Sequence, residues 1–214
     1  EPLLQQTYKQ PILLAVAIST FNQLSGINAL MYYAPHIFKM AGAGADSALL
    51  QAVAVGGTNL VFTMGALLVI DHFGRRKLMI VGSVGYILSL AATAAAFYSY
   101  GTDFDDFGSM VVLMSLLVFI ASHAFGQGSV IWVFLSEIFP NRVRARGQAL
   151  GSFTHWFFAA LISWTFPIIA EVSGGHIFAF YSAMMVLQLI WVLRFMPETK
   201  GVPLEEIQKR LGIE

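Results

Sequence analysis

The sequence predicts an all-α membrane protein with six transmembrane helices. Of its 214 residues, 57% are hydrophobic and 11% are charged, whereas soluble domains carry about 25% charged residues. Six apolar stretches also reach the roughly 20 residues that a membrane-spanning helix requires. Inside a bilayer each segment must satisfy its own backbone hydrogen bonds, and the alternating strands of about 10 residues that mark a barrel are not seen.

The six predicted spans differ in how strongly polar residues interrupt them. In chain order they cover residues 11–33, 49–70, 78–98, 110–139, 149–170 and 178–195. The first and fourth hold the most polar residues, and the first contains Ser25-Gly26, where a helix could unwind. Beyond the last span, residues 204–211 place Leu204, Ile207 and Leu211 on one side of a short amphipathic helix. We therefore divide the chain into a transmembrane domain, 1–196, and a cytoplasmic tail, 197–214.

Basic residues concentrate on one side of the predicted membrane. Except for Lys39, all of the 12 Lys and Arg lie before the first span, between the second and third, between the fourth and fifth, or at the end of the last span and beyond it. Cytoplasmic loops are enriched in Lys and Arg, so both termini are expected in the cytoplasm. The chain has no cysteine, and an integral protein of a bacterial inner (plasma) membrane fits this composition.

Polar side chains inside four spans recur at helical spacing, so each set shares one face of its helix. The sets are Ser19, Asn22, Gln23 and Gly26; Gly56, Asn59 and Thr63; Ser122, Gly126 and Ser129 beside His123 and Gln127; and Gln148, Gly151, Ser152 and His155. Such residues can serve helix packing or line a water-filled cavity. The amides and two imidazoles exceed what packing requires, which favours a cavity.

The character of this cavity indicates its ligand. Asn and Gln each donate and accept hydrogen bonds, which suits a neutral polyhydroxylated molecule, and Trp132 and Trp156 would add flat apolar faces. No Asp or Glu lies in the middle of a span. Without cysteine there is no thiolate metal site, and neither a metal nor a cofactor is expected. Near-zero net charge gives no indication of nucleic-acid binding.

Four motifs in order resemble the sugar porter family of the major facilitator superfamily. Residues 22–33, NQLSGINALMYY, resemble the family's QQxSGxNxxxYY on helix seven. Residues 71–76, DHFGRR, resemble its DxxGRR loop, residues 137–144 its E-x6-R motif, and residues 197–201 its PETKG sequence. The resemblance implies that the six spans are helices 7–12, the C-terminal six-helix bundle of the fold.

The resemblance also implies roles for individual residues. Sugar contacts are implied for Asn22, Gln23, Asn28, Asn59, Trp132, His155 and Trp156. His123 and Gln127, from the fourth-span stripe, complete the predicted substrate-binding set, and Tyr32 and Tyr33 match an outer gate. A cytoplasmic charge network, whose ion pairs would form when the carrier closes inside, is implied for Asp71, Arg75, Arg76, Glu137, Arg144 and Glu198.

Some positions depart from the family pattern. Asn22 replaces the first Gln of the seventh-helix motif and is one methylene shorter. The sequence before Trp132 lacks the two prolines seen in many members, so a bend there depends on Gly126 and Gly128. Ala124 stands where some glucose carriers have an acidic sugar ligand. These departures leave the sugar open between hexoses and pentoses.

We expect the chain to transport sugar by alternating access as the C-terminal half of a carrier. Its expected partners are a monosaccharide, the lipid bilayer, and an N-terminal six-helix half or a second copy of this chain. Proton cotransport stays open, because the acidic residue that resembles a coupling site in family symporters lies on helix one. Two alternatives are a non-transporting half-protein that self-associates and an intramembrane serine hydrolase that uses Ser129 and His155.

Overall fold

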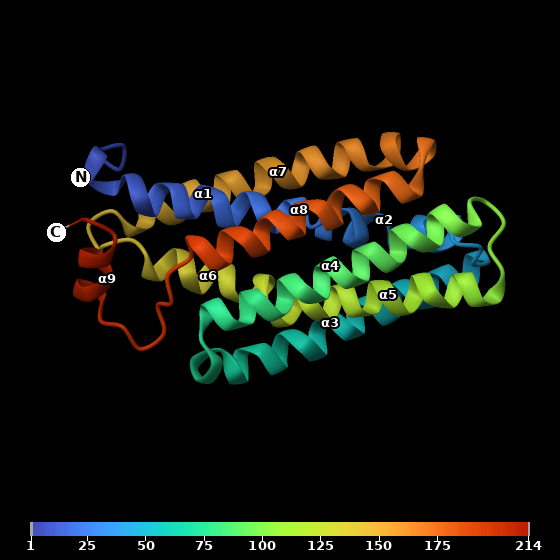
Figure 1. Ribbon diagram of the computed structural model, residues 1–214, viewed down its shortest axis with the longest axis horizontal. Helices are drawn as coiled ribbons and strands as arrows, with labels where there is room; N and C mark the ends of the chain where they lie inside the picture. The colour runs from blue at the N-terminus through green and yellow to red at the C-terminus, as the bar shows by residue number, and fades with distance from the viewer. Residues whose placement is uncertain (1, 214) are drawn as a thin grey trace.

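The computed structural model describes residues 2–213, which form a bundle of long helices aligned along one axis (Figure 1). After a short 3-10 turn, η1 (Gln6–Tyr8), the helices are α1 (Lys9–Leu24), α2 (Ile27–Met40), α3 (Ala45–Phe73), α4 (Arg75–Tyr100), α5 (Asp106–Phe125), α6 (Gln127–Glu137), α7 (Arg144–Val172), α8 (Gly174–Arg194) and α9 (Leu204–Arg210). Glu1 and Glu214, the outer limits of the two predicted segments, lie outside the described residues.

These helices make six spans that are long and apolar enough to cross a membrane, so the predicted fold class is confirmed. The first span, Gln6–Met40, combines α1 and α2, and the fourth, Asp106–Glu137, combines α5 and α6. Our prediction ended the first span at residue 33, whereas α2 continues to Met40. Ala34, Ile37 and Phe38 explain the difference, because they are buried on one face of this turn despite the polar residues between them.

Glycines mark both points where a span is broken. Gly26, between α1 and α2, has φ +83°, and a Cβ there would collide with the ring of Tyr181. Gly126, between α5 and α6, has φ −98° and ψ −102°. A Cβ on Gly126 would lie 3.0 Å from the Cα of Gly82 in α4, so a side chain at this break would require the backbone of α4 to shift. Free backbone groups within a membrane are tolerated where they are buried or line a cavity.

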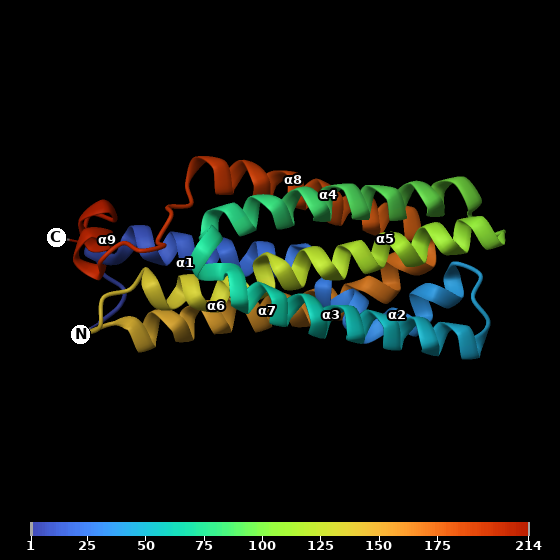
Figure 2. The same ribbon diagram turned by 90° about the horizontal axis from the view of Figure 1, so that it is seen from below.

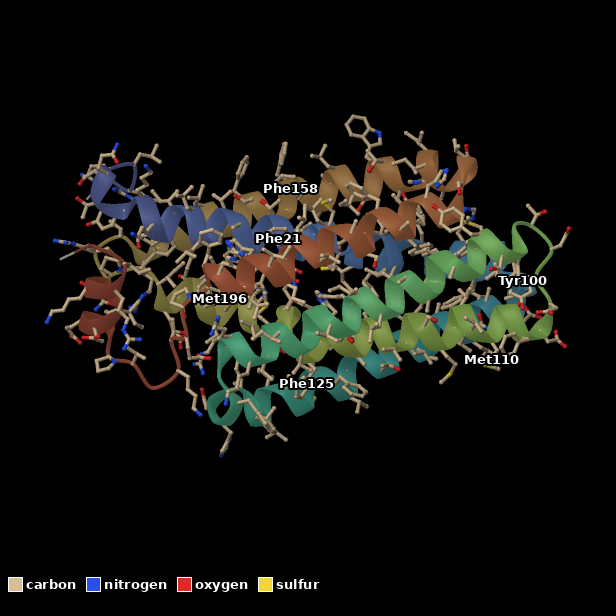
Figure 3. All side chains as sticks on the ribbon, in the orientation of Figure 1. Phe21, Tyr100, Met110, Phe125, Phe158 and Met196 are labelled. Carbon is tan, nitrogen blue, oxygen red and sulfur yellow. The ribbon has the colours of Figure 1, made fainter. Side chains whose placement is uncertain are left out.

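Two apolar clusters fill opposite ends of the bundle. One lies at the end that holds both termini (Figures 1 and 2) and includes Ile18 of α1, Phe134 of α6 and Ile207 of α9. The other includes Leu30 of α2 and Phe119 of α5 and lies toward the far end. Side-chain nitrogens gather mainly at the end with the termini, whereas carbon predominates along the flanks (Figure 3). Between the two clusters lies a polar layer, at the level of the two breaks.

Candidate functional site

The polar layer contains an open cavity of about 260 Å³. Residues from α1, α2, α3, α5, α6 and α7 line it: Asn22, Gln23, Ile27, Asn28, Met31, Asn59, His123, Gly128, Trp132, His155 and Trp156. Eight of the nine predicted substrate-binding residues are in this set, and none of the lining residues is Asp, Glu, Lys or Arg. The structure thus brings together side chains that are up to 134 positions apart, from Asn22 to Trp156.

Both helix breaks adjoin this cavity. The break at Gly26 ends α1 just after Gln23 and starts α2 just before Asn28. Ser25 satisfies part of the freed backbone, because its hydroxyl donates to the Asn22 carbonyl over 2.7 Å. The break at Gly126 separates His123 of α5 from Trp132 of α6 in the same way. Each broken span therefore delivers polar side chains from two helix ends to one place.

Gln23 lies at the centre of the hydrogen bonds around the cavity. Its side chain is fully buried. The Gln23 Nε2 amide nitrogen lies 3.0 Å from His155 Nε2 and 3.3 Å from His155 Nδ1, and its Oε1 accepts a 2.9 Å hydrogen bond from Asn28 Nδ2. Gln23 thereby joins α1, the start of α2 and the middle of α7 around one side of the cavity.

Asn22 leaves one hydrogen-bonding atom of this layer unused. Its Nδ2 lies 3.3 Å from His155 Nδ1, so both ring nitrogens of His155 face amide N–H groups. A neutral imidazole has only one acceptor nitrogen and can accept from only one of these amides. Asn22 Oδ1 is buried and has no hydrogen-bond partner among the described residues. Buried polar atoms are normally paired, so Asn22 Oδ1 is an exception within this layer.

Two tryptophans form the open side of the cavity. The ring of Trp132 lies 5.1 Å from that of His155, and Trp156 meets His155 edge-on at 4.8 Å. Trp132 is 43% exposed and Trp156 is 56% exposed, and Trp156 lies near the middle of its span rather than in an interfacial belt. Flat apolar faces are therefore presented outward next to buried amides.

Tyr86 of α4, which the sequence prediction missed, contacts the cavity-lining His123. It is fully buried behind the cavity, and its hydroxyl hydrogen-bonds Nδ1 of His123. The other ring nitrogen of His123 lies against Gly128, where a Cβ would stand 2.8 Å from it. A tyrosine in the middle of a span is deeper than an aromatic belt predicts, and this depth is the signal that could have identified it.

Other predicted residues lie apart from the cavity lining. Gln127 is fully buried, and its amide donates to the Ile18 carbonyl over 3.3 Å. Ser129 donates to the Ala124 carbonyl over 2.6 Å and is also outside the lining. We therefore leave Gln127 out of the binding site proposed below, and nothing in the geometry joins Ser129 to His155 as a nucleophile–base pair.

The predicted gate residues differ in their surroundings. Tyr33 has non-helical φ and ψ of −116° and 16°, two residues before Pro35. Its hydroxyl donates to the Ser163 carbonyl of α7 over 2.9 Å, and its ring stacks on Phe166 at 5.4 Å. Tyr32 is 59% exposed on the other face. Tyr33 is therefore tied to α7, while Tyr32 is available to a neighbouring surface.

Charged residues form a cluster at the end that holds both termini. Arg75 makes a two-pronged contact with Glu137, with Nη2–Oε1 at 2.6 Å and Nε–Oε2 at 3.1 Å, and also donates to Asp71 over 3.0 Å. Thr199 donates to Glu137 over 2.5 Å. Paired donors of this kind are strong and directional, so the cluster joins α4, the end of α3, the end of α6 and the tail.

Glu198 and the remaining arginines bind backbone groups. The Glu198 carboxylate accepts from the backbone N–H groups of Arg75 and Arg76, at 3.0 Å each, and so caps the N-terminus of α4. Arg76 donates to the carbonyls of Val192 and Leu193 at the end of α8. Arg144 donates to the Phe139 carbonyl over 3.3 Å. Of the six predicted network residues, Arg75 thus forms side-chain ion pairs with two others, Asp71 and Glu137.

Comparison with known proteins places this chain among transporters. A family model described as "Sugar (and other) transporter" matches residues 1–211. The D-xylose-proton symporter of Escherichia coli (strain K12) is 39% identical over 204 residues, which cover 92% of this chain and 40% of the relative. The glucose facilitated diffusion protein of Zymomonas mobilis is 35% identical over 201 residues, covering 91% and 41%. The chain spans about 40% of the length of these curated relatives.

Solved structures match the fold over nearly the whole chain. The proton:xylose symporter XylE bound to 6-bromo-6-deoxy-D-glucose aligns with a TM-score of 0.82 at 38% identity, covering 94% of this chain and 42% of the other. The inward open conformation of XylE from E. coli aligns with a TM-score of 0.81 at 35% identity, with coverage of 94% and 42%. The six-span bundle is thus similar to part of a larger membrane protein.

Proposed function

The chain belongs to the sugar porter family of the major facilitator superfamily, and from this membership we propose that it is the C-terminal six-helix half of a carrier for a neutral monosaccharide. The observation that carries the proposal is the cavity in the polar layer, with its amides, imidazoles and indoles and no charged side chain in its lining. Relatives named as a xylose symporter and a glucose facilitator support a pentose or a hexose as the substrate.

The chemistry of the cavity fits sugar hydroxyls. Asn22, Gln23, Asn28 and Asn59 offer both donors and acceptors, and Asn22 Oδ1 is an acceptor without a partner in the described part of the chain. Trp132 and Trp156 offer apolar faces to the C–H groups of a sugar ring. The volume of about 260 Å³ lies below the roughly 300–1,000 Å³ of pockets for drug-sized ligands. We infer that one monosaccharide binds here.

The open side of the cavity requires a second wall. Polar groups exposed to lipid are costly, and carriers of this type place their site between two helical units that rock around it. We infer that an N-terminal six-helix half covers the face with Trp132 and Trp156. The concentration of basic residues near the termini supports a cytoplasmic location for both ends.

The charge cluster would then serve the cytoplasmic end of the carrier. Arg75, Asp71 and Glu137 form their ion pairs within this half, so they stabilise its own end before any contact with the other half. Asp71 keeps 80% of its side chain exposed and is the member best able to meet a partner surface. We propose that closure on the cytoplasmic side uses this exposed carboxylate.

Substitution of Gln23 tests the proposed sugar site. In the carrier assembled from this chain and its N-terminal half, Gln23→Ala should weaken sugar binding at least about fivefold, because leaving buried partners unpaired costs about 1–3 kcal/mol. Isothermal titration calorimetry with xylose, glucose and fructose measures the effect on whichever sugar the unmodified carrier binds.

The matched control is Gln51→Ala, which removes the same side chain from α3 outside the cavity lining. It should bind sugar like the unmodified carrier. An unchanged dissociation constant for Gln23→Ala would refute the assignment of this residue. If the unmodified carrier bound none of the three sugars, the proposal that it carries such a monosaccharide would be refuted.

A further inference from the structure

A second cavity, a groove of about 600 Å³, lies on the flank of the bundle at the end that holds both termini. We call it the α1–α8 groove. Its lining residues come from α1, α8, the connection between α8 and α9, the end of α9 and the residue after it: Gln10, Leu13, Leu14, Ala17, Trp191, Arg194, Phe195, Pro197, Arg210 and Leu211. It shares no residue with the cavity of the polar layer, and the proposed sugar site makes no use of it.

The walls of the α1–α8 groove are apolar and partly open. Leu13 is 58% exposed and Phe195 is 68% exposed, and Trp191 lines the same groove. Leu13 and Trp191 lie within membrane spans, where an exposed apolar surface meets lipid chains rather than water. A groove with such walls fits an acyl chain better than it fits a polar ligand.

The charged rim of the groove distinguishes it from an ordinary lipid-facing surface. Arg194 is the last residue of α8, at the end of its span, and Arg210 is the last residue of α9. Arg210 contacts Glu206 over 3.1 Å but keeps 52% of its side chain exposed. Among residues 2–213, no carboxylate lies within ion-pair distance of Arg194. Two arginines facing one carboxylate give the rim a net positive charge.

The position of Arg194 at the end of a span matches the depth of a lipid headgroup. Arginines at the ends of spans extend their charged groups to the membrane surface while their stems stay on apolar surface. A guanidinium binds phosphate oxygens through two parallel hydrogen bonds. Basic pockets between transmembrane helices, on the side where basic residues gather, bind anionic lipid headgroups.

We propose that the α1–α8 groove binds one anionic phospholipid, with its phosphate at Arg194 and Arg210 and an acyl chain along Leu13, Trp191 and Phe195. The net positive rim favours a headgroup that carries a net negative charge over a zwitterionic one. The apolar wall requires the acyl chain, so the phosphate alone is not the ligand. The bound lipid would hold the C-terminal tail of the protein, including α9, against the end of α8.

Native mass spectrometry of the full chain in detergent tests the proposal. The chain is titrated with phosphatidylglycerol or with phosphatidylcholine of the same acyl chains, and with glycerol phosphate as a soluble headgroup. We expect one tightly bound phosphatidylglycerol, and at least about tenfold weaker binding in Arg194→Gln/Arg210→Gln, because each basic residue near a membrane surface contributes about 1 kcal/mol to attracting anionic lipid.

The matched control is Lys77→Gln/Arg142→Gln, which removes two positive charges from the same end of the bundle but not from the groove. It should retain the bound phosphatidylglycerol. Equal binding of the two lipids, equal loss in both double variants, or saturation by glycerol phosphate would overturn the proposal. So would a dimer that Arg194→Gln/Arg210→Gln abolishes while lipid binding stays unchanged, since the groove would then hold a second copy.

Discussion

Tyr86 lies behind the cavity and can determine which ring nitrogen of His123 carries the proton. The Tyr86 hydroxyl meets Nδ1 of His123, and the Tyr86 ring is fixed against Phe119 at 5.3 Å. The tautomer of a histidine is set by the hydrogen bond at its other nitrogen. When Tyr86 donates to Nδ1, the proton of a neutral His123 is on Nε2, the nitrogen beside Gly128. Tyr86 is therefore a positioning residue for the proposed sugar site.

Tyr86→Phe should weaken sugar binding by about 2- to 12-fold, the range that corresponds to a hydrogen bond of about 0.5–1.5 kcal/mol. Calorimetry on the carrier measures the affinity, and nitrogen NMR of the His123 ring reports whether its tautomer becomes mixed. Tyr181→Phe is the control, because the Tyr181 hydroxyl is buried and has no hydrogen-bond partner in the described residues. A Tyr86→Phe carrier with normal affinity and an unchanged ring spectrum would contradict the positioning role.

The polar residues of the cavity could be predicted from the sequence, whereas its apolar residues could not. Asn22, Gln23 and His155 are conspicuous because amides and imidazoles are rare in membrane spans. Gln127 has the same polarity, yet its amide bonds the Ile18 carbonyl, and no helical spacing distinguishes a side chain that serves packing from one that faces a cavity. Ile27 and Met31 also line the cavity, and as apolar residues they gave no signal.

At the scale of the helices, the break at Gly26 controls the geometry of the first span. Its left-handed backbone lets α1 end and α2 begin without a connecting loop, and the ring of Tyr181 occupies the space beside it. The bonds of Ser25 to the Asn22 carbonyl and from the Ile27 N–H satisfy the freed backbone. The orientation of Gln23 relative to Asn28 therefore depends on this one glycine.

Gly26→Ala should lower the thermal stability of the chain. The left-handed conformation alone costs a non-glycine residue about 1–2 kcal/mol, and the new methyl group would also displace Tyr181. Circular dichroism melting in detergent measures the change. Gly57→Ala is the control, because nothing lies within 4 Å of a Cβ at Gly57 in α3. Equal melting temperatures for the two variants would show that the break adapts to a side chain.

The helices themselves were largely predictable, because apolar length and basic loops identify six spans without any tertiary information. Ser25-Gly26 and Gly126 were also identified as points of bending. The extension of α2 to Met40 was not predictable, since its polar residues lower the average hydropathy while Ile37 and Phe38 pack inside. Hydropathy averages over a helix, whereas packing depends on one of its faces.

At the scale of the molecule, two apolar clusters separated by a polar layer leave the bundle with one incomplete face. The cavity opens beside Trp132 and Trp156, and α3 carries further exposed apolar residues, such as Leu60 and Leu68. A surface that combines a polar cavity with apolar surroundings suits a protein partner better than lipid. Alternating access requires two such faces.

The chain reconstituted alone in liposomes should therefore give no uptake of radiolabelled xylose or glucose above that of empty vesicles. Addition of the N-terminal half during reconstitution should restore uptake. Leakage of the L-enantiomer of the same sugar serves as the control for intact vesicles. Uptake by the chain alone that Gln23→Ala abolishes would overturn the two-half arrangement and would indicate a carrier made from two copies.

The uncharged lining of the cavity also has an electrical consequence. A charge that crosses the membrane responds to the potential by about 2.3 kcal/mol per 100 mV. With neutral imidazoles, neither the cavity lining nor a bound sugar carries a charge on which the voltage can act. Any dependence of transport on membrane potential would therefore originate in charged groups outside the cavity, such as those of the other half of the proposed carrier or of the charge cluster around Arg75. A voltage-clamp measurement would sense those groups and would be insensitive to the sugar site.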